Sequence, residues 1–225
     1  MNIDYLTIVL VIIITALIYY LFSRYLYNQL LKVRNARSVD GREISSQIIS
    51  GEGLTFTLQD SHKDYQSYID ISKNKLILSH KIINNPSVTS LAIVANELSY
   101  GVMYSKMSLL WLISQITDAL ILLLSSISIL LVFLSLILND ALIYNLGLTL
   151  FLISFLFVLS TFPIGILNSI HSKNLLYKYS LISKRENTSL NLLLIFLSLA
   201  HLNLLVSLVV IVIDYILESL DIKIK

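Results

Sequence analysis

The sequence predicts a mainly α-helical integral membrane protein: a bundle of four transmembrane helices with a small α+β cytoplasmic segment between the first and the second. Three observations predict this fold class. Hydrophobic residues make up 56% of the 225 residues and charged residues only 13%, whereas a soluble domain carries roughly 25% charged residues. The apolar residues gather in four long runs, and most of the basic residues lie in two of the segments between those runs.

Each apolar run is long enough to cross a membrane. The runs are Tyr5–Phe22, Leu109–Leu138, Ala141–Leu167 and Ser189–Leu217. A helix needs about 20 residues to span a hydrocarbon core about 30 Å thick, so the first run just suffices and the other three exceed the need. The excess indicates helices that tilt or project beyond the bilayer. Only Asn139-Asp140 separates the second run from the third, which predicts a tight helical hairpin.

The basic residues set the predicted orientation, because cytoplasmic loops carry an excess of Lys and Arg. These residues are Lys32, Arg34, Arg37, Arg42, Lys173, Lys178, Lys184 and Arg185. The predicted parts are a first transmembrane helix (1–22), a cytoplasmic segment (23–108), a second helix (109–138), a third helix (141–167), a cytoplasmic loop (168–188), a fourth helix (189–217) and a tail (218–225). We therefore expect a multi-pass protein of the cell membrane with both termini outside, although Lys223 and Lys225 oppose this orientation.

Composition also excludes several classes of function. The net charge of +2 is too small to indicate a nucleic-acid partner. The chain has no cysteine, which excludes disulfides and thiolate metal ligands. The lipid bilayer is the partner that the composition requires.

The cytoplasmic segment carries signals for two helices and a strand. Asp40 is followed three residues later by Glu43, the spacing of a capping box. The apolar positions that follow share one helical face: Ile44, Ile48 and Ile49. Gly53 marks the end of this helix, and Lys75–Ser79 is a short β-rich run that predicts a strand. Pro86 precedes a second helix, which begins near Ser87 or Ser90 and continues through Tyr104 towards the second span.

The second helix carries Asn96-Glu97-Leu98-Ser99-Tyr100. This sequence resembles the His-Glu-x-x-His motif of zincins, in which two histidines at i and i+4 bind zinc and the glutamate activates a water. The surroundings strengthen the resemblance, and the chain is similar to the bacterial membrane-bound neutral zinc metallopeptidases of the YugP type. The matching features are Gly41-Arg42-Glu43, Gly53-Leu54, Asp70, Lys75–Ser79, Phe162-Pro163-Ile164-Gly165 and Glu186.

The departures from the family pattern concern the metal ligands. The resemblance implies histidines where this chain has Asn96 and Tyr100, and a glutamate as third ligand where it has Gly165. Only Glu97 matches a catalytic position, that of the general base. An amide is a poor zinc ligand, a phenol is seldom one, and glycine has no side chain. Zinc is the cofactor that the family implies, but for this chain we expect no bound metal.

Two ionisable residues fall deep inside predicted spans, where such groups are rare and indicate function. Asp118 lies in the second span and His201 in the fourth. A rise of about 1.5 Å per residue places both at similar depths. One interpretation pairs them between the two spans; the other gives each a separate polar partner or a water.

The preferred interpretation is a catalytically inactive homologue of a membrane zinc metallopeptidase, a pseudopeptidase. It would bind or scaffold membrane proteins or peptides, or pair with an active family member. A first alternative is an active peptidase with relocated ligands, for which the loop histidines are His62, His80 and His171. A second is a small transporter or lipid-binding bundle that uses Asp118 and His201. No inverted repeat or pair of broken helices supports transport.

Overall fold

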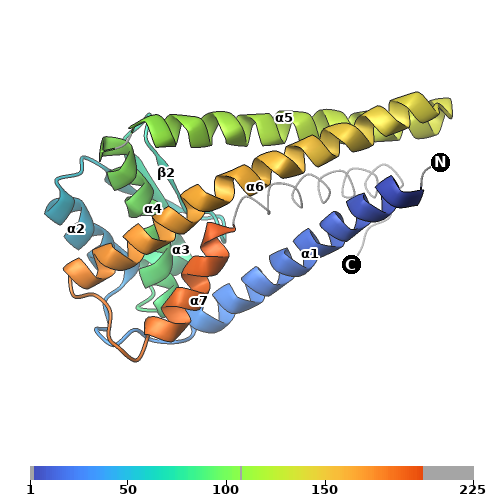
Figure 1. The fold of residues 1–225 in the computed structure, drawn as a ribbon. Coiled ribbons are helices and arrows are strands. Elements are labelled where there is room, and N and C mark those ends of the chain that lie inside the picture. The colour runs from blue at the N-terminus through green and yellow to red at the C-terminus, as the bar shows by residue number, and fades with distance from the viewer. Residues whose placement is uncertain (1–2, 107, 200–225) are drawn as a thin grey trace. The chain divides into compact units, whose positions relative to one another are not determined.

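The structure, a computed structural model, describes residues 3–106 and 108–199. Its elements are α1 (Ile3–Leu31), α2 (Gly41–Glu52), β1 (Thr57–Ser61), β2 (Tyr68–Asp70), β3 (Lys75–Ser79), α3 (His80–Ile83), α4 (Val88–Lys106), α5 (Ser108–Leu138), α6 (Ala141–Lys178) and α7 (Asn187–Ser198) (Figure 1). The predicted fold class, mainly helical with a small sheet, is confirmed. The described residues divide into two compact units: a hairpin unit of residues 3–22, 114–162 and 199, and a sheet unit of residues 23–106, 108–113 and 163–198.

In the hairpin unit, α5 and α6 are joined by Asn139 and Asp140 alone, as the sequence predicts. Asn139 adopts a φ of 52°, and Asp140 Oδ1 accepts a hydrogen bond from the backbone N–H of Leu142 at 2.7 Å, which caps the first turn of α6. The two helices meet closely at Gly147, whose carbonyl accepts a hydrogen bond from Ser128 Oγ at 2.7 Å. Small residues allow such close approach between helices in lipid.

The side chains of the hairpin unit suit an apolar surrounding. Leu142 is 80% exposed, and most of the large exposed side chains on these helices are likewise apolar, while small polar residues are turned inward. Five of those buried residues are Ser125, Ser128, Ser135, Ser154 and Thr161. Each of these five hydroxyls donates to a backbone carbonyl, so their hydrogen-bonding needs are met within the unit.

Two helical segments of the described residues are long and apolar enough to cross a membrane, Leu112–Ser135 and Ala141–Lys178. The first lies within the predicted second span, 109–138, and the second contains the predicted third span, 141–167. The predicted first span falls within α1, and the predicted fourth begins in α7, but its residues 200–217 lie outside the described residues. The total of four spans therefore stays a prediction.

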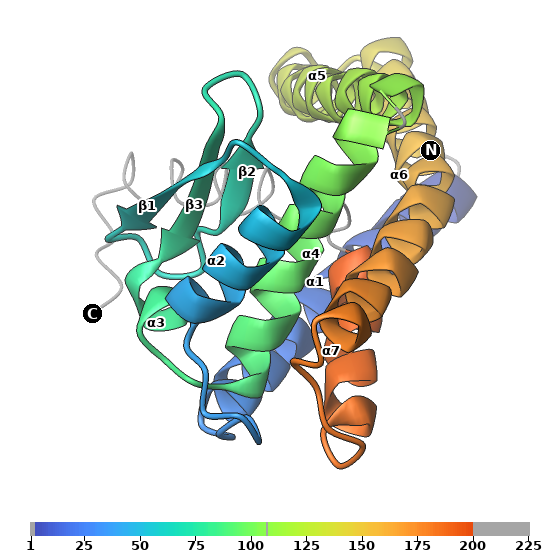
Figure 2. The same ribbon diagram turned by 90° about the vertical axis from the view of Figure 1, so that its left-hand side faces the viewer.

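The sheet unit contains three strands in the order β1-β3-β2 (Figure 2). Strand β3 occupies the predicted residues and lies in the centre, parallel to β1 and antiparallel to β2. Helix α4 is the central helix of this unit, because it packs against α2, α3, β2, β3 and α7. Its buried apolar side chains, Leu91, Val94 and Leu98 among them, join the larger hydrophobic core of the described residues.

The local signals for α2 are confirmed. Asp40 Oδ1 accepts a hydrogen bond from the backbone N–H of Glu43 at 2.9 Å, and Ile44 and Ile48 are fully buried. Gly53 ends the helix with a φ of 65°, a left-handed conformation that glycine adopts without strain.

Two helices extend further than the sequence predicts. Helix α1 continues to Leu31 instead of ending at Phe22, because Leu26, Tyr27 and Leu30 are buried in the core of the sheet unit. Helix α6 continues past Leu167 to Lys178, so residues 168–178 are helical and the prediction of a loop there is wrong. The sequence of residues 168–178 is too polar to continue the apolar run that ends at Leu167. The helix continues because polar side chains such as Asn168 and Ser169 form hydrogen bonds with α4 and α7.

Candidate functional site

The candidate site lies on α4 in the sheet unit, where the chain carries Asn96, Glu97 and Tyr100. Helix α4 starts after Pro86, and Ser87 Oγ accepts a hydrogen bond from the backbone N–H of Ser90 at 3.1 Å, a side-chain cap of its first turn. Residues 88–99 are buried apart from Glu97, which is partly buried. Tyr100 is also partly buried. The motif therefore sits in the interior of the unit, not on a solvated face.

Asn96 is joined to helix α6. The Oδ1 atom of Asn96 accepts a hydrogen bond from Nδ2 of Asn168 at 2.9 Å, and the same amide donates to the backbone carbonyl of Asn96 at 3.2 Å. Asn96 is 5% exposed and Asn168 is fully buried. The side-chain oxygen at this former ligand position is therefore used in a contact between helices.

A second polar contact joins the same two helices one turn further along. Ser99 Oγ lies 3.0 Å from Nδ1 of His171 and 3.2 Å from the backbone carbonyl of Asn168. Ser172 Oγ donates to that carbonyl as well, at 2.6 Å. Asn168 and His171 were not predicted as partners of the motif, because the stretch that carries them was predicted as a loop. Their helical spacing of three residues was the available signal.

Glu97 is the one acidic residue of the motif. The Nδ2 atom of Asn96 lies 3.5 Å from Glu97 Oε1, a long contact. Burial raises the pKa of the Glu97 carboxyl from 4.5 to about 7, while hydrogen bonds from Asn96 and from the backbone N–H of Ile69 act in the opposite direction. Removal from water disfavours the charged form more than these two donors stabilise it.

This pKa predicts a pH-dependent stability. Between pH 4.5 and about 7 the folded state holds a proton on Glu97 that the unfolded state has lost. The contribution of Glu97 to the free energy of unfolding is therefore fully present below pH 4.5. It is lost as the pH rises through about 7, and the total loss is about 3 kcal/mol at most. The Glu97→Gln variant cannot ionise, so we expect its Tm in detergent to match that of the unmodified chain near pH 5 and to exceed it at pH 8. If the Tm of the variant differed from that of the unmodified chain by the same amount at pH 5 and at pH 8, the raised pKa of Glu97 would be contradicted.

Gly165, where the resemblance implies a third ligand, lies on α6 against α7. A Cβ atom built on Gly165 would stand 2.3 Å from the backbone carbonyl oxygen of Ser198. Nearby, Ser169 Oγ donates to the carbonyl of Leu194 at 2.7 Å, so the two helices are held at this distance. The position has no side-chain donor and no room for one.

These residues do not fit a zinc ion. A zinc site needs three or four donors in a tetrahedral arrangement, drawn from thiolate, imidazole and carboxylate groups. Here one ligand position is an amide already bonded to Asn168, one is the phenol of Tyr100, and one is filled by the backbone of α7. Among the described residues, no three His, Asp or Glu side chains are grouped so that they could hold a metal ion.

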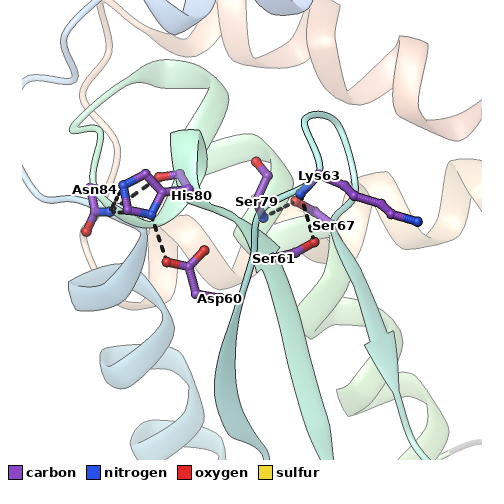
Figure 3. A network of polar contacts seen from close by, with 7 residues as sticks. All are labelled: Asp60, Ser61, Lys63, Ser67, Ser79, His80 and Asn84. Carbon is purple, nitrogen blue, oxygen red and sulfur yellow. Dashed lines mark hydrogen bonds and ion pairs between the residues drawn. The ribbon is translucent and has the colours of Figure 1, made fainter.

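The three histidines expected in loops lie at separate places, and two of them are on helices, His80 on α3 and His171 on α6. His80 Nδ1 contacts Asp60 Oδ2 at 2.8 Å at the end of the sheet, with Asn84 beside it (Figure 3). His171 contacts Ser99, and His62 is exposed. The alternative of a zinc site with relocated ligands therefore finds no ligand group in the part of the chain that the structure describes.

The intramembrane pair remains a prediction. Asp118 is partly buried on α5 in the hairpin unit. His201 lies outside the described residues, so no distance between the two side chains is defined.

One of the comparisons with known proteins finds a match. A family model described as "Putative neutral zinc metallopeptidase" matches residues 5–219, which includes the whole motif and its partners on α6. No curated protein and no solved structure matches the chain. The match covers nearly the full length, and the chain therefore belongs to the neutral zinc metallopeptidase family.

Proposed function

We propose that this chain is a catalytically inactive member of the family, a pseudopeptidase that acts by binding or scaffolding membrane proteins or peptides. The observation that carries this proposal is the hydrogen bond between Asn96 and Asn168. In this bond the side-chain oxygen of Asn96, the residue where the family pattern has a ligand, accepts from Asn168 and joins α4 to α6. The contact of Gly165 with α7 supports the same conclusion from the other side of the site.

Glu97 alone does not support hydrolysis. A metal ion lowers the pKa of its bound water from about 15.7 to about 7, and this is what makes water a nucleophile in such enzymes. A pKa of about 7 would suit a general base, but a base without the metal cannot supply this change in the pKa of water.

Zinc content tests the proposal directly. We expect the purified chain, exposed to zinc and then dialysed against metal-free buffer, to retain far less than one zinc per molecule by elemental analysis. The double variant Asn96→His/Tyr100→His is the matched control, because it places two imidazoles at i and i+4 around Glu97 and should retain more zinc. Stoichiometric zinc on the unmodified chain, or casein hydrolysis that a chelator abolishes and Glu97→Gln removes, would contradict the proposal.

We propose further that the protein crosses the cell membrane four times, with residues 23–108 and 168–188 in the cytoplasm. The apolar exposed faces of α5 and α6 support a lipid environment, and the basic residues of both segments support the orientation. In this arrangement the sheet unit would present its surface to cytoplasmic or membrane-bound partners, among them an active family member. Proteolysis of residues 23–108 in inside-out but not in right-side-out membrane vesicles tests the orientation.

A further inference from the structure

The small sheet has two edge strands, and helix α4 covers one of them. The strand order β1-β3-β2 leaves β1 and β2 at the edges (Figure 2). The backbone N–H of Ile69 in β2 donates to the carboxyl group of Glu97 on α4. The side chain of Ile69 also lies against the same helix, because a Cβ atom built on Gly101 would stand 2.8 Å from Ile69 Cδ1. The edge at β2 is therefore occupied by a helix of the same unit.

The opposite edge, at β1, is open within the described residues. The backbone N–H of Thr57 donates to the carbonyl of Asn74 at 2.8 Å, which directs the backbone groups of Thr57 towards β3. Because the backbone groups of successive strand residues point to opposite sides of the strand, those of Leu58 and Asp60 point outward. No hydrogen bond among the described residues uses these outward N–H and carbonyl groups.

The β1 edge lacks the features that usually protect an exposed edge strand. Such strands commonly carry lysine, proline or a bulge that prevents further pairing. Residues 57–61 contain no lysine or proline, and their register with β3 runs without interruption. Their one charged side chain is Asp60, whose carboxylate is held by His80 Nδ1 at 2.8 Å (Figure 3). The edge thus presents alternating donors and acceptors, which an extended chain can match.

The side chains beside this edge indicate the chemistry of the chain that fits it. Leu58 and Asp60 share one face of β1. Leu58 packs against the core, and the Asp60 side chain is 37% exposed. Opposite charges on neighbouring strands are favourable and like charges are unfavourable. Antiparallel pairing with a second copy of β1 would bring two Asp60 carboxylates to diagonal positions, whereas a basic residue beside Asp60 is favourable.

We propose that the free edge of β1 binds an extended segment of a partner protein as an additional strand, with an apolar residue beside Leu58 and a basic residue beside Asp60. This inference rests on the proposed function, because it names how a binding protein without a metal would hold a peptide. It places the contact at the edge of the sheet that α4 leaves open, not at Glu97.

The test measures binding of a fluorescein-labelled peptide, Thr-Val-Thr-Lys-Thr-Val-Thr, to the full chain in phosphatidylcholine nanodiscs. Antiparallel pairing can place the lysine beside Asp60 and a valine beside Leu58. N-methylation of the valine and lysine amides then removes the N–H groups that face β1, and we expect binding to weaken at least about tenfold. N-methylation of the last three threonine amides alters the outer side of the added strand and should change affinity less than about threefold.

Variants of the chain test the same contact from the other side. Leu58→Pro removes an outward N–H and keeps those of Thr57 and Gln59, which face β3, and proline is tolerated at such edge positions. We expect this variant to bind the peptide about tenfold more weakly. Leu58→Ala is the matched control, because it also loses the leucine side chain but keeps the N–H, and its affinity should change less than about threefold. On the unmodified chain, peptide binding should slow amide hydrogen exchange at Leu58 and Asp60.

Several results overturn the proposal, and those from the peptide series do not depend on the folding of any variant. The peptide fails to bind, or its two N-methylated forms bind equally well. Peptide binding slows amide exchange at Ile69 and not at Leu58, which would place the peptide beside α4. The chain associates with itself through β1 and excludes the peptide. None of these results bears on zinc binding, so this proposal and the assignment of an inactive peptidase fail independently.

Discussion

Replacing Gly165 with glutamate, the residue that the family pattern implies at this position, is expected to disrupt the sheet unit instead of restoring a metal ligand. The first side-chain carbon would stand 2.3 Å from the carbonyl oxygen of Ser198. The atom it meets belongs to the backbone of α7, so relief requires moving that helix. Overpacking in a core costs typically 1–3 kcal/mol and more where backbone must shift, so we expect a loss above about 3 kcal/mol.

Thermal unfolding in detergent measures this effect. Gly165→Ala separates the steric cost from the charge, because it adds the clashing carbon alone, and it should also lower the Tm. Asn174→Glu is the matched control, since it adds the same charge at an exposed position of α6 and should change stability by no more than about 0.5 kcal/mol. A Gly165→Glu variant as stable as the unmodified chain would show that α7 yields easily.

The second large effect is expected for Glu186→Ala. Glu186 is 8% exposed, and its two oxygens accept hydrogen bonds from Ala36 and Ser183. Its removal leaves the N–H of Ala36 and the N–H and hydroxyl of Ser183 without this acceptor, in hydrogen bonds that are only partly buried. A buried unsatisfied group costs about 1–3 kcal/mol, and partial burial favours the lower end of that range, so we expect a loss of about 3 kcal/mol in total and faster amide exchange at Ala36.

Two variants calibrate the Glu186 result. Glu186→Gln keeps one acceptor oxygen and should lose less than half as much stability as Glu186→Ala. Glu43→Ala removes an exposed carboxylate near the same loops and should cost less than about 1 kcal/mol. Unfolding curves that coincide for Glu186→Ala and Glu43→Ala would refute the role assigned to Glu186.

Elements with strong local signals are predictable from the sequence. Asp40 and Gly53 bound α2 through capping chemistry that depends only on neighbouring residues. Strand β3 is recognisable because Leu76, Ile77 and Leu78 form a continuous buried run. The hairpin at Asn139-Asp140 follows from the spacing of two long apolar runs.

Elements that depend on distant partners are not predictable in this way. Strands β1 and β2 are short and contain no fully buried residue, and they exist through pairing with β3. The end of α6 has a polar sequence that reads as a loop, yet Asn168 is fully buried because Asn96 accepts its amide protons. For the site, the sequence shows which residues stand where the family pattern has ligands. It does not show that Asn96 binds α6 or that Gly165 is covered by α7.

Helix α6 contains Pro163, and the boundary between the two compact units falls directly before that residue. Proline lacks an N–H, so the carbonyl one turn earlier loses its partner and the helix bends there more easily than elsewhere. The backbone hydrogen bonding of α6 is thus interrupted where the two compact units meet, whereas the hydrogen bonds from Asn168 to Asn96 lie five residues further on, inside the sheet unit.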